Sequence, residues 1–181
     1  DKNAKNTTNF NSTDCTDYPC PFDISNIKNA PNCSSENNYG YFDKEPCIII
    51  KLNKVFGFFP DPENMPLTRL ESTWLNYDPS KDRDHDAVWL GCFADQGEKD
   101  ALVGLKYYPF PGYNAVNFPY LYQEDYQQPL VMAKLIIRPD FKGTFQITCR
   151  AYAINIRHEN VATDPSRNTG TVRLKLDVSD S

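Results

Sequence analysis

The sequence predicts a mainly β protein: an antiparallel β-sandwich with long loops, at most one short helix and three disulfides. Segments 145–151 and 172–178 each alternate apolar and polar side chains, the period of a strand with one face in a core and the other in water. No long helical pattern separates the strand-like segments, which argues against a parallel sheet. The six cysteines, an even number, favour covalent bridges.

The composition is that of one folded domain. A chain of 181 residues is long enough to bury a sizeable core. Aromatic residues make up 13% of it, far more than a disordered chain carries. The net charge of −5 is spread along the chain with both signs, which excludes the basic stripe of a nucleic-acid-binding protein. Residues 1–14, polar and rich in Asn and Thr, are predicted to form a flexible stalk, and residues 15–181 a single domain.

The first predicted strand is the apolar run CIIIKLNKVFGF at 47–58, in which β-branched residues dominate. Its first residues are apolar on both faces, which predicts a strand in the centre of a sheet. A long polar segment follows. Within it Leu67, Leu70 and Trp74 have helical spacing, which indicates one short helix.

Further strands are predicted between this segment and the alternating pair near the C-terminal end. Segment 86–93 carries one apolar face, made of Val88, Leu90 and Cys92. Segment 100–110 is predicted to be its hairpin partner. Segment 130–138 is apolar on both faces, as expected of a buried strand.

The cysteines are predicted to form three disulfides. Six cysteines allow fifteen pairings, and sequence alone does not choose among them. Cys92 and Cys149 each share a face with core residues, which favours a bridge between them across the sandwich. Closing so long a loop contributes about 4 kcal/mol in the chain-entropy model. For the other four, sequential pairing needs the shortest excursions of the chain, and it joins Cys15 to Cys20 and Cys33 to Cys47.

Glycosylation signals point to an oxidising compartment. Sequons for N-glycosylation begin at Asn6, Asn11 and Asn32. No run reaches the ~20 apolar residues that a membrane-spanning helix needs, and no signal peptide precedes Asp1. We therefore expect either a mature secreted chain or an extracellular domain separated from its membrane anchor.

Nothing in the sequence predicts catalysis, a metal or a cofactor. The cysteines lack zinc-ligand spacing and are assigned to bridges. Asp82, Asp84 and Asp86 resemble the start of a calcium loop, but Ala87 stands where glycine is needed and Phe93 where a bidentate Glu is needed. The absence of a nucleophile elbow and of a P-loop argues against a secreted hydrolase and against ATP binding.

Three motifs resemble the beta subunit of the sodium/potassium-transporting P-type ATPase. NCSSENNYGYFDKEPCIIIKLNKVFGFFP at 32–60 is similar to the family's N-C-S sequon, Y-G-Y turn and P-C-I-I-I-K-L-N segment. FPYLYQEDYQQPLVMAKL at 118–135 resembles its F-P-Y-Y and Q-P-L segments, with Leu121 in place of the second adjacent Tyr. ITCRAYAINI at 147–156 resembles a third motif. Beta subunits of the proton/potassium pump share much of this pattern.

The resemblance implies an immunoglobulin-like extracellular sandwich with cysteines bridged in sequential order. It also implies a type II plasma-membrane protein whose N-terminal membrane helix is absent from this chain. The function implied is that of a non-catalytic accessory subunit, which stabilises and traffics the catalytic alpha subunit and modulates extracellular cation affinity. The alternative is an adhesion ectodomain that binds beta subunits on neighbouring cells.

An aromatic segment that lacks strand alternation is the predicted partner-binding surface. Large rings with few rotatable bonds are typical of protein interfaces, and the segment lies at the family's F-P-Y-Y position. The resemblance implies that it docks onto the alpha subunit. The predicted contact residues are Phe118, Pro119, Tyr120, Tyr122 and Tyr126.

Overall fold

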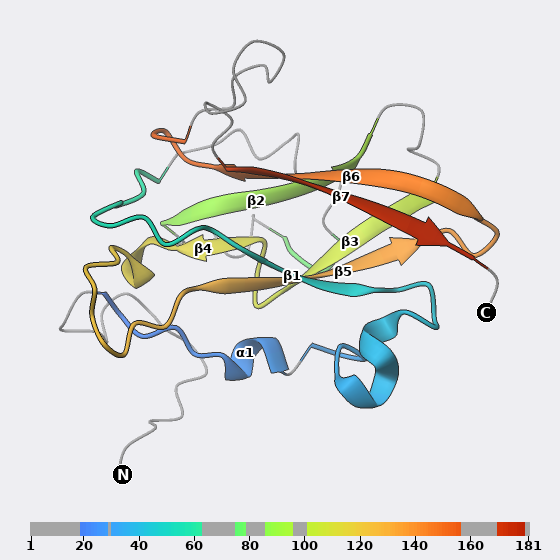
Figure 1. Cartoon of the computed structure of the whole chain (residues 1–181), viewed down its shortest axis with the longest axis horizontal. Helices are drawn as coiled ribbons and strands as arrows, with labels where there is room; N and C mark the ends of the chain where they lie inside the picture. The colour runs from blue at the N-terminus through green and yellow to red at the C-terminus, as the bar shows by residue number, and fades with distance from the viewer. Residues whose placement is uncertain are drawn as a thin grey trace.

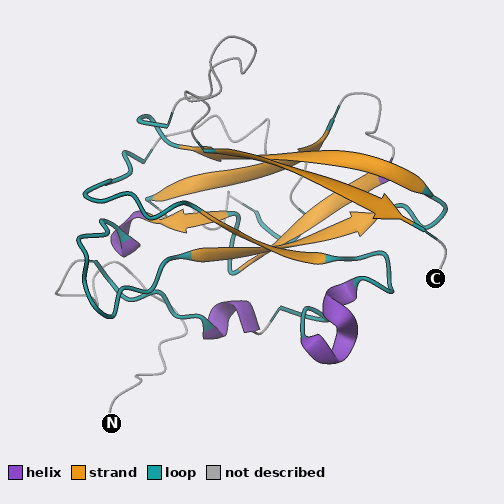
Figure 2. Cartoon of the chain, in the orientation of Figure 1, coloured by secondary structure: helices purple, strands orange, loops and turns teal. Residues whose placement is uncertain are grey.

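The protein is a two-layer antiparallel β-sandwich. The computed structural model describes residues 19–28, 30–62, 75–78, 86–95, 101–156 and 170–179. In Figure 1, β6 and β7 pass above β1 and β5, so that the two sheets face each other. Strands dominate the described residues, and the helices are short and peripheral (Figure 2). The predicted mainly β fold is confirmed.

Seven strands make up the two sheets. The three-stranded sheet has the order β1-β5-β3, with β1 Cys47–Lys51, β5 Leu130–Ile137 and β3 Leu102–Tyr108. The four-stranded sheet has the order β4-β2-β6-β7, with β4 Gly112–Asn114, β2 Ala87–Ala94, β6 Gly143–Tyr152 and β7 Thr171–Val178. The helical elements are α1 Ser25–Lys28 and the 3-10 helices η1 Ser35–Gly40 and η5 Ala115–Asn117.

Two predictions about strand neighbours are wrong. The strand expected in the centre of a sheet is β1, which lies at an edge and ends at Lys51. Ile49, on its outer face, is 57% exposed. The segment expected to pair with β2 is β3, which instead pairs with β5 in the other sheet. Apolar residues on both faces do not distinguish an edge strand from a central strand, because the side chains of one strand do not determine how many strands pair with it.

The core between the sheets follows the predicted alternation. In β6, Phe145, Ile147 and Cys149 are at most 1% exposed, and Arg150 on the other face is exposed. Thr148 is the exception: it lies on the predicted solvent face but is buried, and its hydroxyl donates to Asp95 Oδ1 at 2.8 Å. Each fully buried aliphatic or phenyl side chain contributes roughly 1.5–3 kcal/mol relative to its exposed state. The opposite sheet supplies an apolar set of the same kind, in which the residues are Ile50, Leu105, Tyr107, Val131, Ala133 and Leu135.

The long-range disulfide lies within one sheet. Cys92 on β2 stands directly opposite Cys149 on β6, and the two are bonded. The pairing is the predicted one, but the prediction that it crosses the sandwich is wrong, because neighbouring strands of one sheet can also point two side chains into the same core. The link across the sandwich is a hydrogen bond instead: the Cys92 N–H donates to Tyr107 Oη of the opposite sheet at 3.1 Å.

The second disulfide fastens an outer layer onto the three-stranded sheet. It joins Cys33, after α1, to Cys47 at the start of β1. Both cysteines pack with Ile27 of α1 and Met132 of β5 in a small apolar cluster. Cys20 is also disulfide-bonded, and its predicted partner Cys15 lies outside the described residues.

Several sequence predictions fall outside the part of the chain that the structure describes. These are the stalk 1–14, the sequons at Asn6 and Asn11, the helix at 67–74 and the acidic residues Asp82 and Asp84. Among the described residues, no helix combines the length and the apolar character required to cross a membrane.

Candidate partner-binding surface

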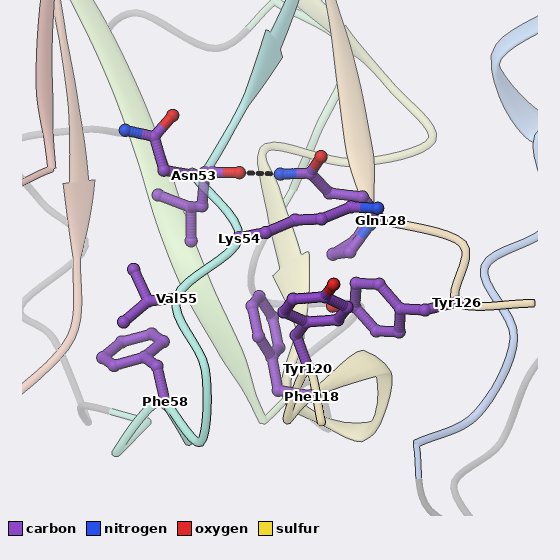
Figure 3. A pocket seen from close by; sticks show the side chains of 10 residues that line it. Asn53, Lys54, Val55, Phe58, Phe118, Tyr120, Tyr126 and Gln128 are labelled. Carbon is purple, nitrogen blue, oxygen red and sulfur yellow. Dashed lines mark hydrogen bonds between the residues drawn. The ribbon is translucent and has the colours of Figure 1, made fainter. Parts of the chain in front are cut away.

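Two loop segments far apart in the sequence lie side by side at one end of the sandwich. Segment 52–59 leaves the edge strand β1, and segment 118–128 leads into β5. Phe56 and Tyr120 form an isolated parallel bridge, in which the Gly57 N–H donates to the Tyr120 carbonyl at 2.9 Å. The Gln128 side-chain amide donates to the Leu52 carbonyl (Figure 3). Backbone bonds thus hold the two loops together where the sheet has ended.

The side chains of these loops form a connected cluster of rings. Phe56 stacks on Tyr122 with ring centroids 4.9 Å apart. The ring of Tyr120 contacts Tyr122 edge-on at 5.3 Å and Tyr126 at 5.1 Å. We call Phe56, Tyr120, Tyr122, Tyr126 and the adjoining Lys54 the aromatic surface.

The aromatic surface is exposed to solvent. Tyr122 is 72% exposed and Phe56 58%, whereas Tyr120 and Tyr126 are half-buried beneath them. Three further apolar side chains on the same two loops are about as exposed as Phe56, and these are Val55, Phe59 and Leu121. A contiguous exposed apolar patch on a soluble domain marks an interaction site more often than chance.

The rings are held in place from below. Tyr126 Oη donates to the Asn117 carbonyl at 3.0 Å, and its partial burial raises the pKa of Tyr126 above the ordinary value. The buried side chain of Asn117 in turn donates to the Cys20 carbonyl at 2.9 Å. The segment around Cys20 is therefore bonded to the base of the aromatic surface.

The structure places the five predicted contact residues in two different environments. Tyr120, Tyr122 and Tyr126 come together on the surface, and Pro119 is half-buried beside them. Phe118 does not line the surface: it is 5% exposed and packs edge-on against Phe58 in the core, with centroids 6.1 Å apart. The prediction for Phe118 is corrected accordingly, because its ring turns inward and supports the loop.

The pocket between the two loops holds about one water-sized group. It is lined mainly by apolar side chains, including Leu52, Phe58 and Phe118. A cavity of that size does not enclose a metabolite or a cofactor, whose sites are usually far larger. The arrangement therefore fits a polypeptide that lies across the rings.

Comparison with known proteins gives the family. A family model described as "Sodium / potassium ATPase beta chain" matches residues 1–173. The chain belongs to this family. The resemblance found in the sequence motifs is thereby confirmed. The match covers both loops of the aromatic surface and every strand up to β6, and it ends within β7.

Named relatives of the chain are subunits of the same pump. It is 33% identical over 150 residues to the sodium/potassium-transporting ATPase subunit beta-1 of Drosophila melanogaster, covering 80% of this chain and 47% of the relative. It is 31% identical over 172 residues to the probable subunit beta-3 of Caenorhabditis briggsae, covering 93% and 48%. The human subunit beta-2 is 28% identical over 168 residues, covering 90% and 50%. The chain spans about half the length of these curated relatives.

Sequence reasoning missed the half of the aromatic surface that comes from segment 52–59. The sequence predicts a strand over 47–58, which would include Lys54 and Phe56, but β1 ends at Lys51. A signal was present, because Lys54 breaks the apolar face that Ile50 and Leu52 begin, and Gly57 follows three residues later. Gly57 has φ 68, a left-handed conformation that favours glycine and that ends a strand.

Proposed function

We propose that this domain is the extracellular part of a non-catalytic accessory subunit of a cation-transporting P-type ATPase. In this role it binds the catalytic alpha subunit, stabilises it for trafficking and modulates its extracellular cation affinity. Membership of the family supports the class of partner. The exposed aromatic surface is the observation that carries the binding role, because Tyr122 and Phe56 present large rings to solvent on loops tied together by backbone bonds.

The chemistry of the surface suits a protein partner. Tyrosine combines a large buried area with a hydroxyl that can bond a loop backbone. The rings are already packed against one another at 4.9–5.3 Å, so that docking costs little conformational entropy. Contacts of this kind concentrate binding energy in a few residues.

The test is assembly of the full-length protein with a catalytic subunit. Truncating Tyr120 and Tyr122 together to Ala should weaken assembly by about 2–4 kcal/mol if they are hot spots. The matched control is Tyr41→Ala with Phe42→Ala, two rings that are 56% and 69% exposed on the loop after η1. Co-purification is the readout. A Tyr120/Tyr122 variant that assembles as well as the control would count against the proposal.

We further propose that the natural protein is a glycosylated plasma-membrane protein, with a membrane helix N-terminal to the stalk and this domain outside the cell. Asn32 is exposed, as an acceptor site must be, and precedes the disulfide-bonded Cys33. Asn6 and Asn11 would carry glycan on the stalk. Protein made in eukaryotic cells should lose mass on glycosidase treatment. The Asn32→Gln variant should lose less mass than the wild type, by the mass of one glycan.

Adhesion between copies on neighbouring cells is the second candidate, and the edge strand β7 favours it. Within the described residues β7 pairs only with β6, so its outer edge is open. Two copies paired antiparallel about Lys175 would place Arg173 of each opposite Asp177 of the other, a favourable cross-strand pair. Asp177→Arg should then abolish self-association of protein-coated beads. The swap Arg173→Asp with Asp177→Arg should restore self-association. Equal self-association of the single variant and the swap would exclude this mode of pairing.

A further inference from the structure

Lys54 is the one cation of the aromatic surface, and its position is unusual. Its ammonium lies 5.2 Å from the ring centroid of Tyr120 and 5.5 Å from that of Tyr126. Figure 3 shows the side chain stretched across these two rings toward Gln128. A cation above the faces of two tyrosines is attracted by both rings. Lys54 therefore lies among the rings that a docking protein would cover.

Lys54 has no carboxylate partner within the described part of the chain. No described Asp or Glu oxygen lies within 4 Å of its ammonium, and the ion pairs that are described involve Lys134 and Arg138 instead. The nearest acidic residues in the sequence of the opposing loop are Glu124 and Asp125, which are exposed in the turn between Tyr122 and Tyr126. Lys54 is exposed, so its charge is open to solvent.

Docking changes this balance. A partner that covers the rings removes the water from the Lys54 ammonium. An unpaired desolvated charge is costly, and two tyrosine faces offset only part of that cost. A carboxylate supplied by the partner would offset this desolvation cost. The ion pair that it forms with the Lys54 ammonium would be stronger once water is excluded. The same pairing would reject partners that present a cation at this position, which is how charges at interfaces give specificity.

We propose that Lys54 is a specificity-determining residue of the aromatic surface, which receives an Asp or Glu carboxylate from an extracellular loop of the protein that docks there. This inference rests on the proposed function, since it requires the aromatic surface to be the docking site. It assigns the partner segment a chemistry: apolar residues to cover the rings, and one carboxylate that reaches the ammonium above Tyr120 and Tyr126.

The experiment measures assembly of the full-length protein with a catalytic subunit as a function of salt. Lys54→Met keeps an aliphatic chain over the rings but removes the charge, Lys54→Gln is a second neutral replacement, and Lys54→Arg keeps the charge. Lys51→Met is the matched control, because Lys51 is an exposed lysine of β1 whose ammonium is not described above the ring of Tyr120 or Tyr126. Captured complexes are washed from about 0.1 M to about 1 M NaCl, across which the screening length falls from about 10 Å to about 3 Å.

The expected result is that both neutral variants assemble roughly tenfold less well at low salt and lose most of the salt dependence of the wild type. Lys54→Arg and Lys51→Met should behave like the wild type, and the melting temperature of every variant should stay within a few degrees. Neutral variants that keep the wild-type recovery and salt dependence would overturn the inference. If they do so while the Tyr120/Tyr122 variant fails to assemble, only the role of Lys54 falls. If the Tyr120/Tyr122 variant also assembles, the docking site itself is wrong.

Discussion

Tyrosine serves two opposite purposes in this molecule, in the interior of the sandwich and on the aromatic surface. Tyr107 and Tyr113 lie in strands and are at most 1% exposed, whereas Tyr122 lies in a loop and is 72% exposed. The residue type is the same, but in the interior the backbone fixes the ring by strand alternation, and at the surface the rings fix one another by stacking. For these three tyrosines, burial therefore goes with a regular backbone and exposure with an irregular one.

Removing the Cys92–Cys149 disulfide should destabilise the fold most severely. Replacing both cysteines by Ala should lower the free energy of unfolding by about 4 kcal/mol, because the bridge closes the longer of the two described loops, with a sequence separation of 57. The Cys33–Cys47 pair, with a separation of 14, should cost about 3 kcal/mol when replaced in the same way. Denaturant unfolding of the non-reduced proteins measures both, and a reversed order would contradict the loop argument.

The boundary between core and surface should be visible four residues apart. Phe118→Ala should cost about 3 kcal/mol in stability, since it empties a buried site. Tyr122→Ala should change stability by less than about 0.5 kcal/mol, as an exposed substitution does. Thermal unfolding separates the two variants. A stable Phe118 variant would show that this ring belongs to the surface after all.

Removing the hydroxyl groups of the two buried tyrosines should have different effects on stability. Tyr107→Phe removes the acceptor of the Cys92 N–H and should cost about 1–2 kcal/mol. Tyr113→Phe should be neutral or stabilising by up to about 1 kcal/mol, because the buried Tyr113 hydroxyl has no hydrogen-bond partner among the described residues. Equal losses in the two variants would mean that the Tyr113 hydroxyl is satisfied in solution.

Alkaline titration should test the burial of the interior tyrosines without any mutation. Burial raises the pKa of Tyr107 and of Tyr113 above the ordinary value of 10.0. Above pH ~10 the unfolded chain loses these protons while the folded chain keeps them, so the stability that is fully present at lower pH falls as the pH rises. Tyrosinate absorbance and circular dichroism, followed together as the pH rises, measure ionisation and unfolding. The two buried rings should ionise only with unfolding.

Strand content could be predicted from the sequence, but strand neighbours could not. The alternation in β6 and β7 identifies both strands, because a period of two is a local property of the chain. It also identifies the buried face of β6, whereas the apolar face of β7 is only partly buried. Which strand lies beside β2 depends on how the chain crosses between sheets. The local sequence does not encode that choice, and the assignment of β3 to β2 therefore failed although both strands exist.

The aromatic surface was half predictable for a similar reason. Tyr120, Tyr122 and Tyr126 lie in one irregular segment, so that composition alone marked them. Lys54 and Phe56 join them from 64 or more positions away, through a bridge that forms only in the folded protein. Phe118 misled the prediction because one turn of backbone can send neighbouring rings to opposite sides, and composition does not record direction.

The bonds that hold Cys20 beside the aromatic surface have a mechanical consequence. The Cys20 N–H donates to the Val116 carbonyl, and the Cys20 carbonyl accepts from Asn117, whose own carbonyl holds the Tyr126 hydroxyl. A force applied to the chain before Cys20 would thus be transmitted through Asn117 to the Tyr126 ring by two hydrogen bonds, without passing through a strand. If the chain is anchored before Cys20, as proposed, a pull on it would act on the base of the aromatic surface and would change the orientation of that surface before it strained the sandwich.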